Sequence, residues 1–161
     1  MSTLYVDNLR PNLTNGISLS GYIIQTKMVK SSTTASTDST TGAVSTDLAM
    51  NFTPLRSDSK ILITIMAASE SLGSYSDRGF QGRIYRDGSE IYTSQYDLYM
   101  SGDTTQRIQK TTYQFFEESP GTSTVNYAFY IQSTGGGTTN SVARLNIYGA
   151  PSTMVIQEVA P

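Results

Sequence analysis

The feature that most constrains the fold is the recurrence of large apolar residues at every second position. Between residues 125 and 131 each alternate side chain is large and apolar, while Asn126, Ala128 and Tyr130 point the other way. A period of two is typical of a β-strand with one buried face. The same alternation occurs at Leu48, Met50 and Phe52; at Phe80 and Ile84; at Tyr113 and Phe115; and at Ala143, Leu145 and Ile147. No window of about 11 residues carries a helical repeat, so we expect little helix.

Turn signals separate these segments. Residues 86–89 contain Asp87-Gly88, which predicts a hairpin, and Thr53-Pro54 and residues 119–122 predict further tight turns. The glycine-rich residues 133–141 are expected to form a flexible tip. Residues 61–66 are apolar on both faces, which predicts a central strand covered on two sides. Short strands joined by short turns predict an all-β fold, an antiparallel β-sandwich or jelly roll.

Two segments depart from this rhythm. Residues 31–46 are rich in Ser and Thr, which predicts an exposed edge strand or a loop. Residues 1–20 are too apolar for a free tail and too short for a core of their own. We therefore expect an N-terminal arm over 1–20 and a β-sandwich domain over 21–161. The alternative for residues 1–20 is an edge strand of the same domain. The apolar residues of the arm are Leu4, Val6, Leu9, Ile17 and Leu19.

Composition excludes several function classes. The 161 residues include no Cys, His or Trp, so thiolate chemistry, imidazole bases and their metal sites are absent. Lys and Arg number 11 against 13 Asp and Glu, without a basic run, which argues against nucleic-acid binding. No apolar stretch reaches the ~20 residues of a membrane span, and the N-terminus lacks the pattern of a secretory signal. We expect no cofactor and no metal site.

Carboxylates give little support to an enzyme. Glycoside hydrolysis needs two acids on one side of a bond, whereas Glu117 and Glu118 are adjacent on a strand and point to opposite faces. Asp87, Asp97 and Asp103 lie in or beside turns, where Asp hydrogen-bonds to the local backbone. The sequence therefore predicts no catalytic residue.

Residues 91–100 hold three tyrosines among amide and carboxylate groups. Such a surface suits a subunit interface or a glycan, because Tyr offers apolar area with a polar tip. A partly exposed strand with Tyr chosen for β propensity is the third interpretation. The contact residues in question are Tyr92, Tyr96, Asp97 and Tyr99.

Several segments, in order along the chain, resemble virion structural and tail-fibre proteins of tailed phages, marine and cyanobacterial phages among them. Near the N-terminus the similar segments are residues 2–9 and 15–26. The others are residues 52–54 with 57–63, the hairpin at 83–91, the turn at 118–127 and the closing strand at 152–160. The Ser/Thr-rich residues 31–46 match in character only.

The resemblance implies a non-enzymatic component on the outer surface of a phage particle, made in the host cytoplasm. It implies a tail-fibre or tail-appendage protein with a homotrimeric β-knob, an arm bound to other virion proteins and a knob that contacts a host surface glycan. A capsid decoration protein is the alternative, because no room is left for a long shaft. A glycan-degrading enzyme is the competitor from another class.

Overall fold

The computed structural model describes residues 21–38, 40–72, 78–94, 97–98, 106–118, 120–135 and 142–161. Its elements are β1 (Ile23–Ser31), β2 (Ala35–Thr37), β3 (Val44–Phe52), β4 (Lys60–Leu72), β5 (Arg78–Arg86), β6 (Ser89–Thr93), β7 (Gln106–Glu118), β8 (Val125–Gly135), β9 (Val142–Leu145), the 3-10 turn η1 (Ile147–Gly149) and β10 (Ser152–Val159). The prediction of an all-β chain is confirmed for this part of the sequence. No helix within these ranges is long and apolar enough to cross a membrane.

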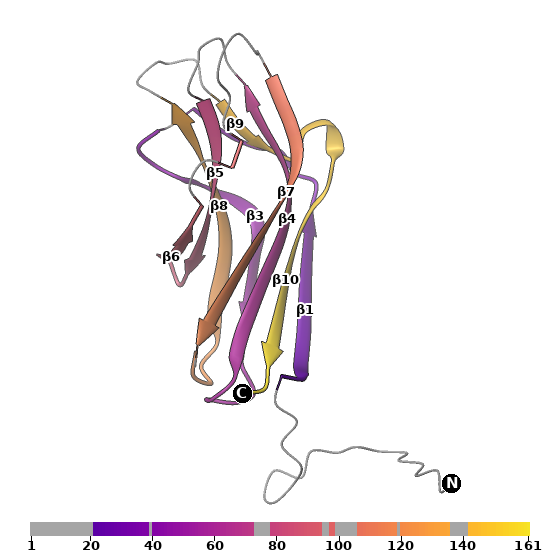
Figure 1. Cartoon of the computed structure of the whole chain (residues 1–161), viewed down its shortest axis with the longest axis vertical. Helices are drawn as coiled ribbons and strands as arrows, with labels where there is room; N and C mark the ends of the chain where they lie inside the picture. Colours follow the sequence, from indigo (N-terminus) through magenta and orange to yellow (C-terminus); the bar gives the residue numbers. More distant parts are fainter. Residues whose placement is uncertain are drawn as a thin grey trace, which may run out of the picture.

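The strands form two antiparallel sheets that face each other as the layers of a sandwich (Figure 1). Sheet A has the order β1-β10-β4-β9-β2, with β7 also paired to β4, and sheet B has the order β3-β8-β5-β6. Without the short strands β2 and β9, the two layers are β1-β10-β4-β7 and β3-β8-β5-β6. This is the strand order of a jelly roll, so the predicted sandwich or jelly roll is confirmed.

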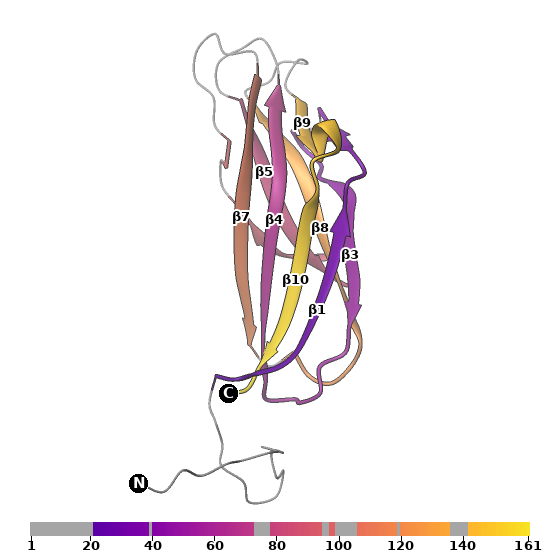
Figure 2. The ribbon, with the colours of Figure 1, turned by 90° about the vertical axis from the view of Figure 1, so that its right-hand side faces the viewer.

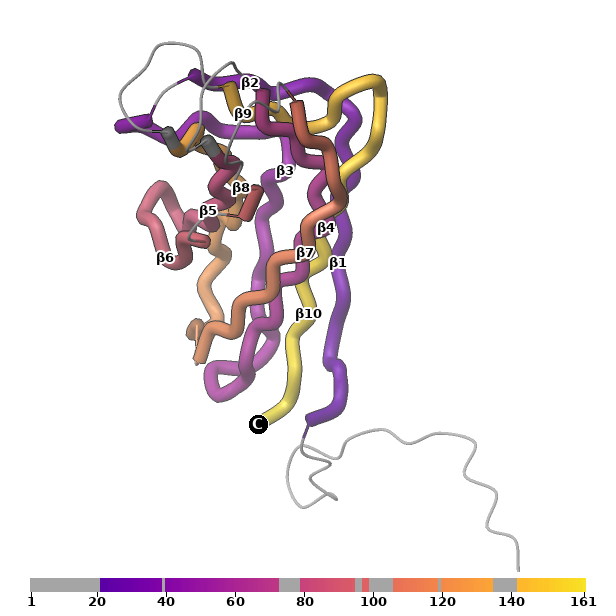
Figure 3. Tube along the Cα trace, turned by 45° about the horizontal axis from the view of Figure 1, so that its top comes forward, coloured from indigo at the N-terminus to yellow at the C-terminus, as the bar shows by residue number. Residues whose placement is uncertain are grey.

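Strand β4 organises sheet A. It pairs with β7 along its whole length, from Lys60 opposite Glu118 to Leu72 opposite Gln106. On its other side it pairs first with β10 and then, from Ser69 onward, with β9. The left-handed backbone of Asn146 ends β9, and η1 carries the chain away from the sheet before β10 begins (Figure 3).

The core lies between the inward faces of the two sheets. Ile61, Ile63 and Ile65 of β4 are fully buried, and β8 supplies Tyr127 and Phe129, which are also fully buried. Each large apolar side chain that is removed from water contributes about 1.5–3 kcal/mol before the entropy of ordering is subtracted. The alternation noted in the sequence therefore describes the inner face of each sheet.

Two turn predictions are confirmed. Asp87 and Gly88 both have positive φ, of 48° and 80°, as a two-residue hairpin turn of type I′ requires between β5 and β6. Gly121, with φ of 81°, lies in the turn between β7 and β8. Asp-Gly and Pro-Gly pairs report such turns because their backbone preferences are local.

Two boundaries differ from the prediction. Residues 133–135 continue β8 and are not part of a flexible tip, because they pair with β5 as far as Gly135 opposite Arg78. Residues 136–141, the rest of that segment, lie outside the described residues. Ile147 is buried but follows the end of β9, so its alternation with Leu145 does not continue a strand.

The segment 31–46 agrees with its prediction. It contains β2, a three-residue edge strand that pairs with β9, with irregular backbone at residues 32–34 before it and bends at residues 40–42 after it. Its short side chains suit the edge of a sheet, where a long apolar strand would invite pairing with other chains.

The prediction that residues 61–66 are covered on both faces is wrong for the outer face. Leu62 and Thr64 are half-buried there, and Met66 is 49% exposed. None of the described strands lies over this part of sheet A (Figure 2). The apolar pattern on its outer side therefore has a cause other than the core of this domain.

Candidate functional site

The arm residues Leu4, Val6, Leu9, Ile17 and Leu19 lie outside the described residues, so the attachment arm stays a prediction. The structure does show where the chain joins the domain at that end. The backbone N–H of Gly21 donates to the Ala160 oxygen at 3.2 Å, and the N–H of Ala160 donates to the Tyr22 oxygen at 2.9 Å. Residues 21 and 22 therefore lie beside the C-terminal strand at one end of the sandwich (Figure 1).

Of the four predicted interface or glycan residues, Tyr96 and Tyr99 lie outside the described residues. Tyr92 lies on β6 and turns its ring inward. It packs against the core and against Phe115 of β7, with ring centroids 5.8 Å apart. Burial, followed by the negative charge of Asp97, raises the pKa of the Tyr92 hydroxyl. Tyr92 thus helps to close the side of the sandwich between β6 and β7.

Asp97 uses its polar groups within the domain. Its carboxylate accepts hydrogen bonds from the Gly82 N–H at 3.2 Å and from the Ser94 hydroxyl. Its own N–H donates to the Phe80 oxygen at 3.0 Å. Asp97 lies in a turn, as predicted, but its backbone partners belong to β5 and are not local, so the contacts hold this turn against β5.

The adjacent acids of β7 point to opposite faces, as the sequence predicts. Glu117 points inward, where it accepts hydrogen bonds from Arg86 and from the hydroxyl of buried Tyr127. Glu118 points outward and pairs with Lys60 at 2.9 Å. Burial and the hydrogen bond to Glu117 raise the pKa of Tyr127. Glu117 therefore ties the two sheets together.

Glu158 is a buried carboxylate that the sequence analysis did not single out. It accepts hydrogen bonds from the backbone N–H groups of Leu55 and Arg56, from the Ser59 hydroxyl at 2.7 Å and from the Gln25 amide at 2.7 Å. Burial acts to raise its pKa, but these four donors together hold the pKa below the usual value. The alternation of β10 places residue 158 inward and could have identified it as a buried charge that needs partners.

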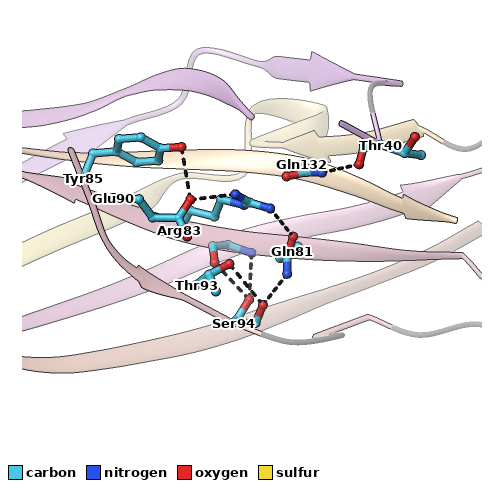
Figure 4. A network of polar contacts seen from close by, with 9 residues as sticks. Thr40, Gln81, Arg83, Tyr85, Glu90, Thr93, Ser94 and Gln132 are labelled. Atoms are coloured by element: carbon cyan, nitrogen blue, oxygen red, sulfur yellow. Dashed lines mark hydrogen bonds and ion pairs between the residues drawn. The ribbon is translucent and has the colours of Figure 1, made fainter. Parts of the chain in front are cut away.

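The outer face of sheet B carries a polar network (Figure 4). Arg83 donates to Glu90 at 2.6 Å and to Gln81 at 2.9 Å, and the Tyr85 hydroxyl donates to Glu90 at 3.2 Å. Tyr85 and Tyr130 pack with ring centroids 4.1 Å apart. Most polar groups on this face are therefore satisfied by one another.

The outer face of sheet A has the opposite character. Three rows of side chains cross β1, β10, β4 and β7, and apart from Lys30 at the end of one row they carry no charge. We call the following set the uncharged face: Thr26 and Met28 of β1; Thr153, Val155 and Gln157 of β10; Leu62, Thr64 and Met66 of β4; and Thr112, Gln114 and Phe116 of β7.

Large apolar side chains on this side of the sheet are open to solvent. Met28 is 65% exposed, and Met66 and Phe116 are each 49% exposed. At the ends of the same face, Ile23 and Ile108 are 53% and 50% exposed. Met28, Met66 and Phe116 lie in different rows, mostly among Thr and Gln, and several exposed large apolar residues on one surface mark a candidate interaction site.

The turn η1 stands out from sheet A on the same side as the uncharged face (Figures 1 and 2). Its Tyr148 is 86% exposed and has a φ of 53°, which is costly for a residue with a side chain. Asn146 holds the turn in place, because its side-chain amide donates to the Thr33 oxygen at 2.9 Å and its oxygen accepts from the Ser152 hydroxyl at 2.5 Å. The turn therefore presents an aromatic ring from a fixed backbone.

No protein-family model and no curated protein sequence matches the chain. Among solved structures, the chain is similar to the VP2 subviral particle of infectious bursal disease virus at 14% identity and a TM-score of 0.45, over 98% of this chain and 42% of that one. The structure of the Gt strain of the same virus has 15% identity and a TM-score of 0.44, over 98% of this chain and 43% of that one. Dimeric latent PorU from Porphyromonas gingivalis has 10% identity and a TM-score of 0.40, over 88% of this chain and 13% of that one.

The chain thus spans less than half the length of each of these proteins. At such identities and TM-scores the similarity is limited to a jelly-roll-like arrangement of strands. The strand order described above carries the assignment of the fold.

Proposed function

We propose that the chain is a non-enzymatic structural protein of a phage virion, a tail-fibre or tail-appendage component that forms a trimeric β-knob. The observation that carries the proposal is the jelly-roll strand order in a chain whose strand and turn segments resemble, in sequence order, those of phage virion proteins. Jelly rolls occur in capsid and lectin domains, where a rigid sandwich presents loops and surfaces for assembly or recognition. Because the fold hosts several functions, the proposal also needs the following two observations.

The environments of the acids favour a structural role. Glu117, Glu158 and Asp97 each accept hydrogen bonds that connect strands or anchor loops. Asp87 accepts the Asn126 N–H at 2.8 Å and supports the hairpin turn. Among the residues that the structure describes, no group of three or more acids is placed to hold a metal ion.

The direction of the strands suits attachment at one end and display at the other. Residues 21 and 22 pair with the C-terminal segment at one end. The end of β4, the start of β5, the start of β7 and the end of β8 lie at the opposite end of the sandwich (Figure 1). We propose that residues 1–20 bind other virion proteins and that this opposite end faces outward.

The test is quantitative mass spectrometry of purified particles with and without residues 1–20 of this chain. We expect the full chain in the particles at a low copy number and the truncated chain, folded by circular dichroism, to be lost from them. A copy number comparable to that of the capsid subunits would favour capsid decoration instead. Absence of the full chain from the particles would overturn the virion role.

Contact with a host glycan is a second candidate function, and the outer face of sheet B favours it. Arg83 Nε and Gln132 Oε1 are buried without a hydrogen-bond partner among the described residues, beside the rings of Tyr85 and Tyr130. Aromatic rings with amide and guanidinium groups suit a sugar. Glycan-array binding that is lost in Tyr130→Ala would support this contact. Turnover of the bound glycan, lost in Asp97→Asn, would support the enzyme instead.

A further inference from the structure

None of the described strands covers the uncharged face, although it carries large apolar side chains. Residues 61–66 have the sequence of a strand buried on both sides, yet only the inward side meets the core. An exposed sheet face normally alternates toward charged and polar residues, as sheet B does with Arg83 and Glu90. The outward positions of β4 and β7 in the three rows carry Leu62, Met66 and Phe116, and the other three are uncharged: Thr64, Thr112 and Gln114.

We propose that a second copy of this chain covers the uncharged face, with Tyr148 of η1 as part of the contact. This inference rests on the proposed function, because it names the surface through which the subunits of the virion component would assemble. It concerns only the packing of one copy against another. In a two-fold dimer this face meets the same face of the second copy, whereas in a closed trimer a different surface of the neighbouring copy covers it.

The distribution of charge supports a second copy as the occupant. When two copies use the same face, a charge near the symmetry axis meets its own like charge. The charged side chains nearest the uncharged face lie at its margins. Lys30 ends one row, Lys110 of β7 lies above the rows opposite Ala68, and Lys60 and Glu118 pair below the rows. The positions between these margins can therefore meet a second copy without burying a charge.

The size of the face sets the strength of the contact. Four strands about 4.8 Å apart and seven residues of about 3.3 Å each give a projected area of about 440 Å². The exposed side chains of Met28, Met66, Phe116 and Tyr148 add to it. This is closer to half than to the whole of the ~800 Å² that each partner buries in an interface of standard size, so we expect a weak, concentration-dependent association.

The test is sedimentation equilibrium of the full chain and of two single variants with charges of opposite sign, Met66→Glu and Phe116→Lys. We expect the unmodified chain to self-associate and both variants to associate about 30-fold more weakly or worse, since each places a charge in a desolvated contact. The matched control is Ala49→Glu on β3, an exposed position on the outer face of sheet B. It should associate like the unmodified chain.

A second measurement needs no variant. The rates at which Met28 and Met66 are oxidised by peroxide are compared at high and low protein concentration, with the partly buried Met50 as the internal reference. We expect about tenfold protection of Met28 and Met66 on association and no change at Met50, because thioether oxidation follows exposure. A chain that stays monomeric at about 100 μM, or that associates without protecting these two residues, overturns the inference and leaves this face to a different protein.

Particle incorporation separates this inference from the proposed function. Self-association through this face by a chain that is absent from particles would support the inference and overturn the virion role. Incorporation of Met66→Glu and Phe116→Lys at the normal copy number, with Met28 still oxidised at the free rate, would support the virion role and overturn the inference.

Discussion

The two outer faces of the sandwich differ in how their side chains are satisfied. On sheet B, Arg83, Glu90 and Gln81 bond to one another, and Tyr85 packs on Tyr130. On sheet A, the outward side chains of four adjacent strands include exposed Met28, Met66 and Phe116, and the residues between them are uncharged, mostly Thr and Gln. Most polar groups on the outer face of sheet B are paired with one another. Covering the apolar side chains on the outer face of sheet A would lower the free energy, because it removes them from water.

This difference shows that the outward positions of a strand carry information about assembly as well as solubility. Both sheets bury their inner faces in the same core, so core packing cannot explain why their outer faces differ. A polar network that satisfies itself limits the groups left to bind a partner, while an uncharged apolar face favours one through the hydrophobic effect.

The largest expected effect is on sheet A, at the buried carboxylate of Glu158 on β10. Glu158→Ala leaves the N–H groups of Leu55 and Arg56 and the Ser59 hydroxyl without their acceptor. We expect the free energy of unfolding to fall by about 3 kcal/mol, since buried donors that lose a charged partner are costly. Urea denaturation followed by circular dichroism, at fixed protein concentration, measures it. An unchanged midpoint would show that the loop after β3 does not depend on this carboxylate.

The pH dependence of the free energy of unfolding is a second test of Glu158. Because the pKa of Glu158 is lower in the folded chain than in the unfolded one, its ionisation stabilises the fold above the unfolded value of about 4.3. That contribution is lost as the pH falls through the folded pKa. We expect Glu158→Gln to lose less stability than the unmodified chain as the pH is lowered from about 4.3 through the folded pKa, measured as acid unfolding curves. Parallel curves for the two chains would contradict the expectation.

The next effect lies where sheet B meets β7. A Cβ at Gly82 would come within 2.6 Å of Tyr113 Cζ and 2.9 Å of Phe129. We expect Gly82→Ala to destabilise the fold by about 2 kcal/mol, because the sheets must move apart to admit the methyl group. Ser45→Ala, an exposed change on the same sheet, is the control for thermal unfolding. A stability equal to that of the unmodified chain would mean that the Tyr113 ring yields without cost.

The smallest expected effects are the coupling energies of two ion pairs, one on each outer face. The Arg83–Glu90 pair of sheet B has side chains 22% and 32% exposed, whereas Lys60 and Glu118 at the margin of sheet A are 40% and 67% exposed. Double-mutant cycles to alanine should give a coupling of about 1 kcal/mol for the first pair and about 0.3 kcal/mol for the second. Equal couplings would mean that the network of sheet B is no more integrated than a solvated pair.

Much of the fold could be predicted from local patterns. Alternation located the buried face of β3, β5 and β8, and Asp87-Gly88 identified the hairpin, because side-chain direction and turn conformation depend on near neighbours in the chain. The end of β8 and the break at Asn146 were missed, since both depend on pairing with β5 and on contacts with Thr33 and Ser152. Of the predicted contact residues that the structure describes, Tyr92 and Asp97 are engaged within the domain.

The amino-acid order alone set the class of the fold, the inward face of the strands that alternate, and the lack of thiol and imidazole side chains, because each of these follows from residue type and short spacing. The three-dimensional arrangement was needed to bring Met28, Met66 and Phe116 onto one face and to give Glu158 its four donors. Those residues come from segments far apart in the chain. Their proximity depends on which strands pair and in what register, and a period of two is the same for every pairing.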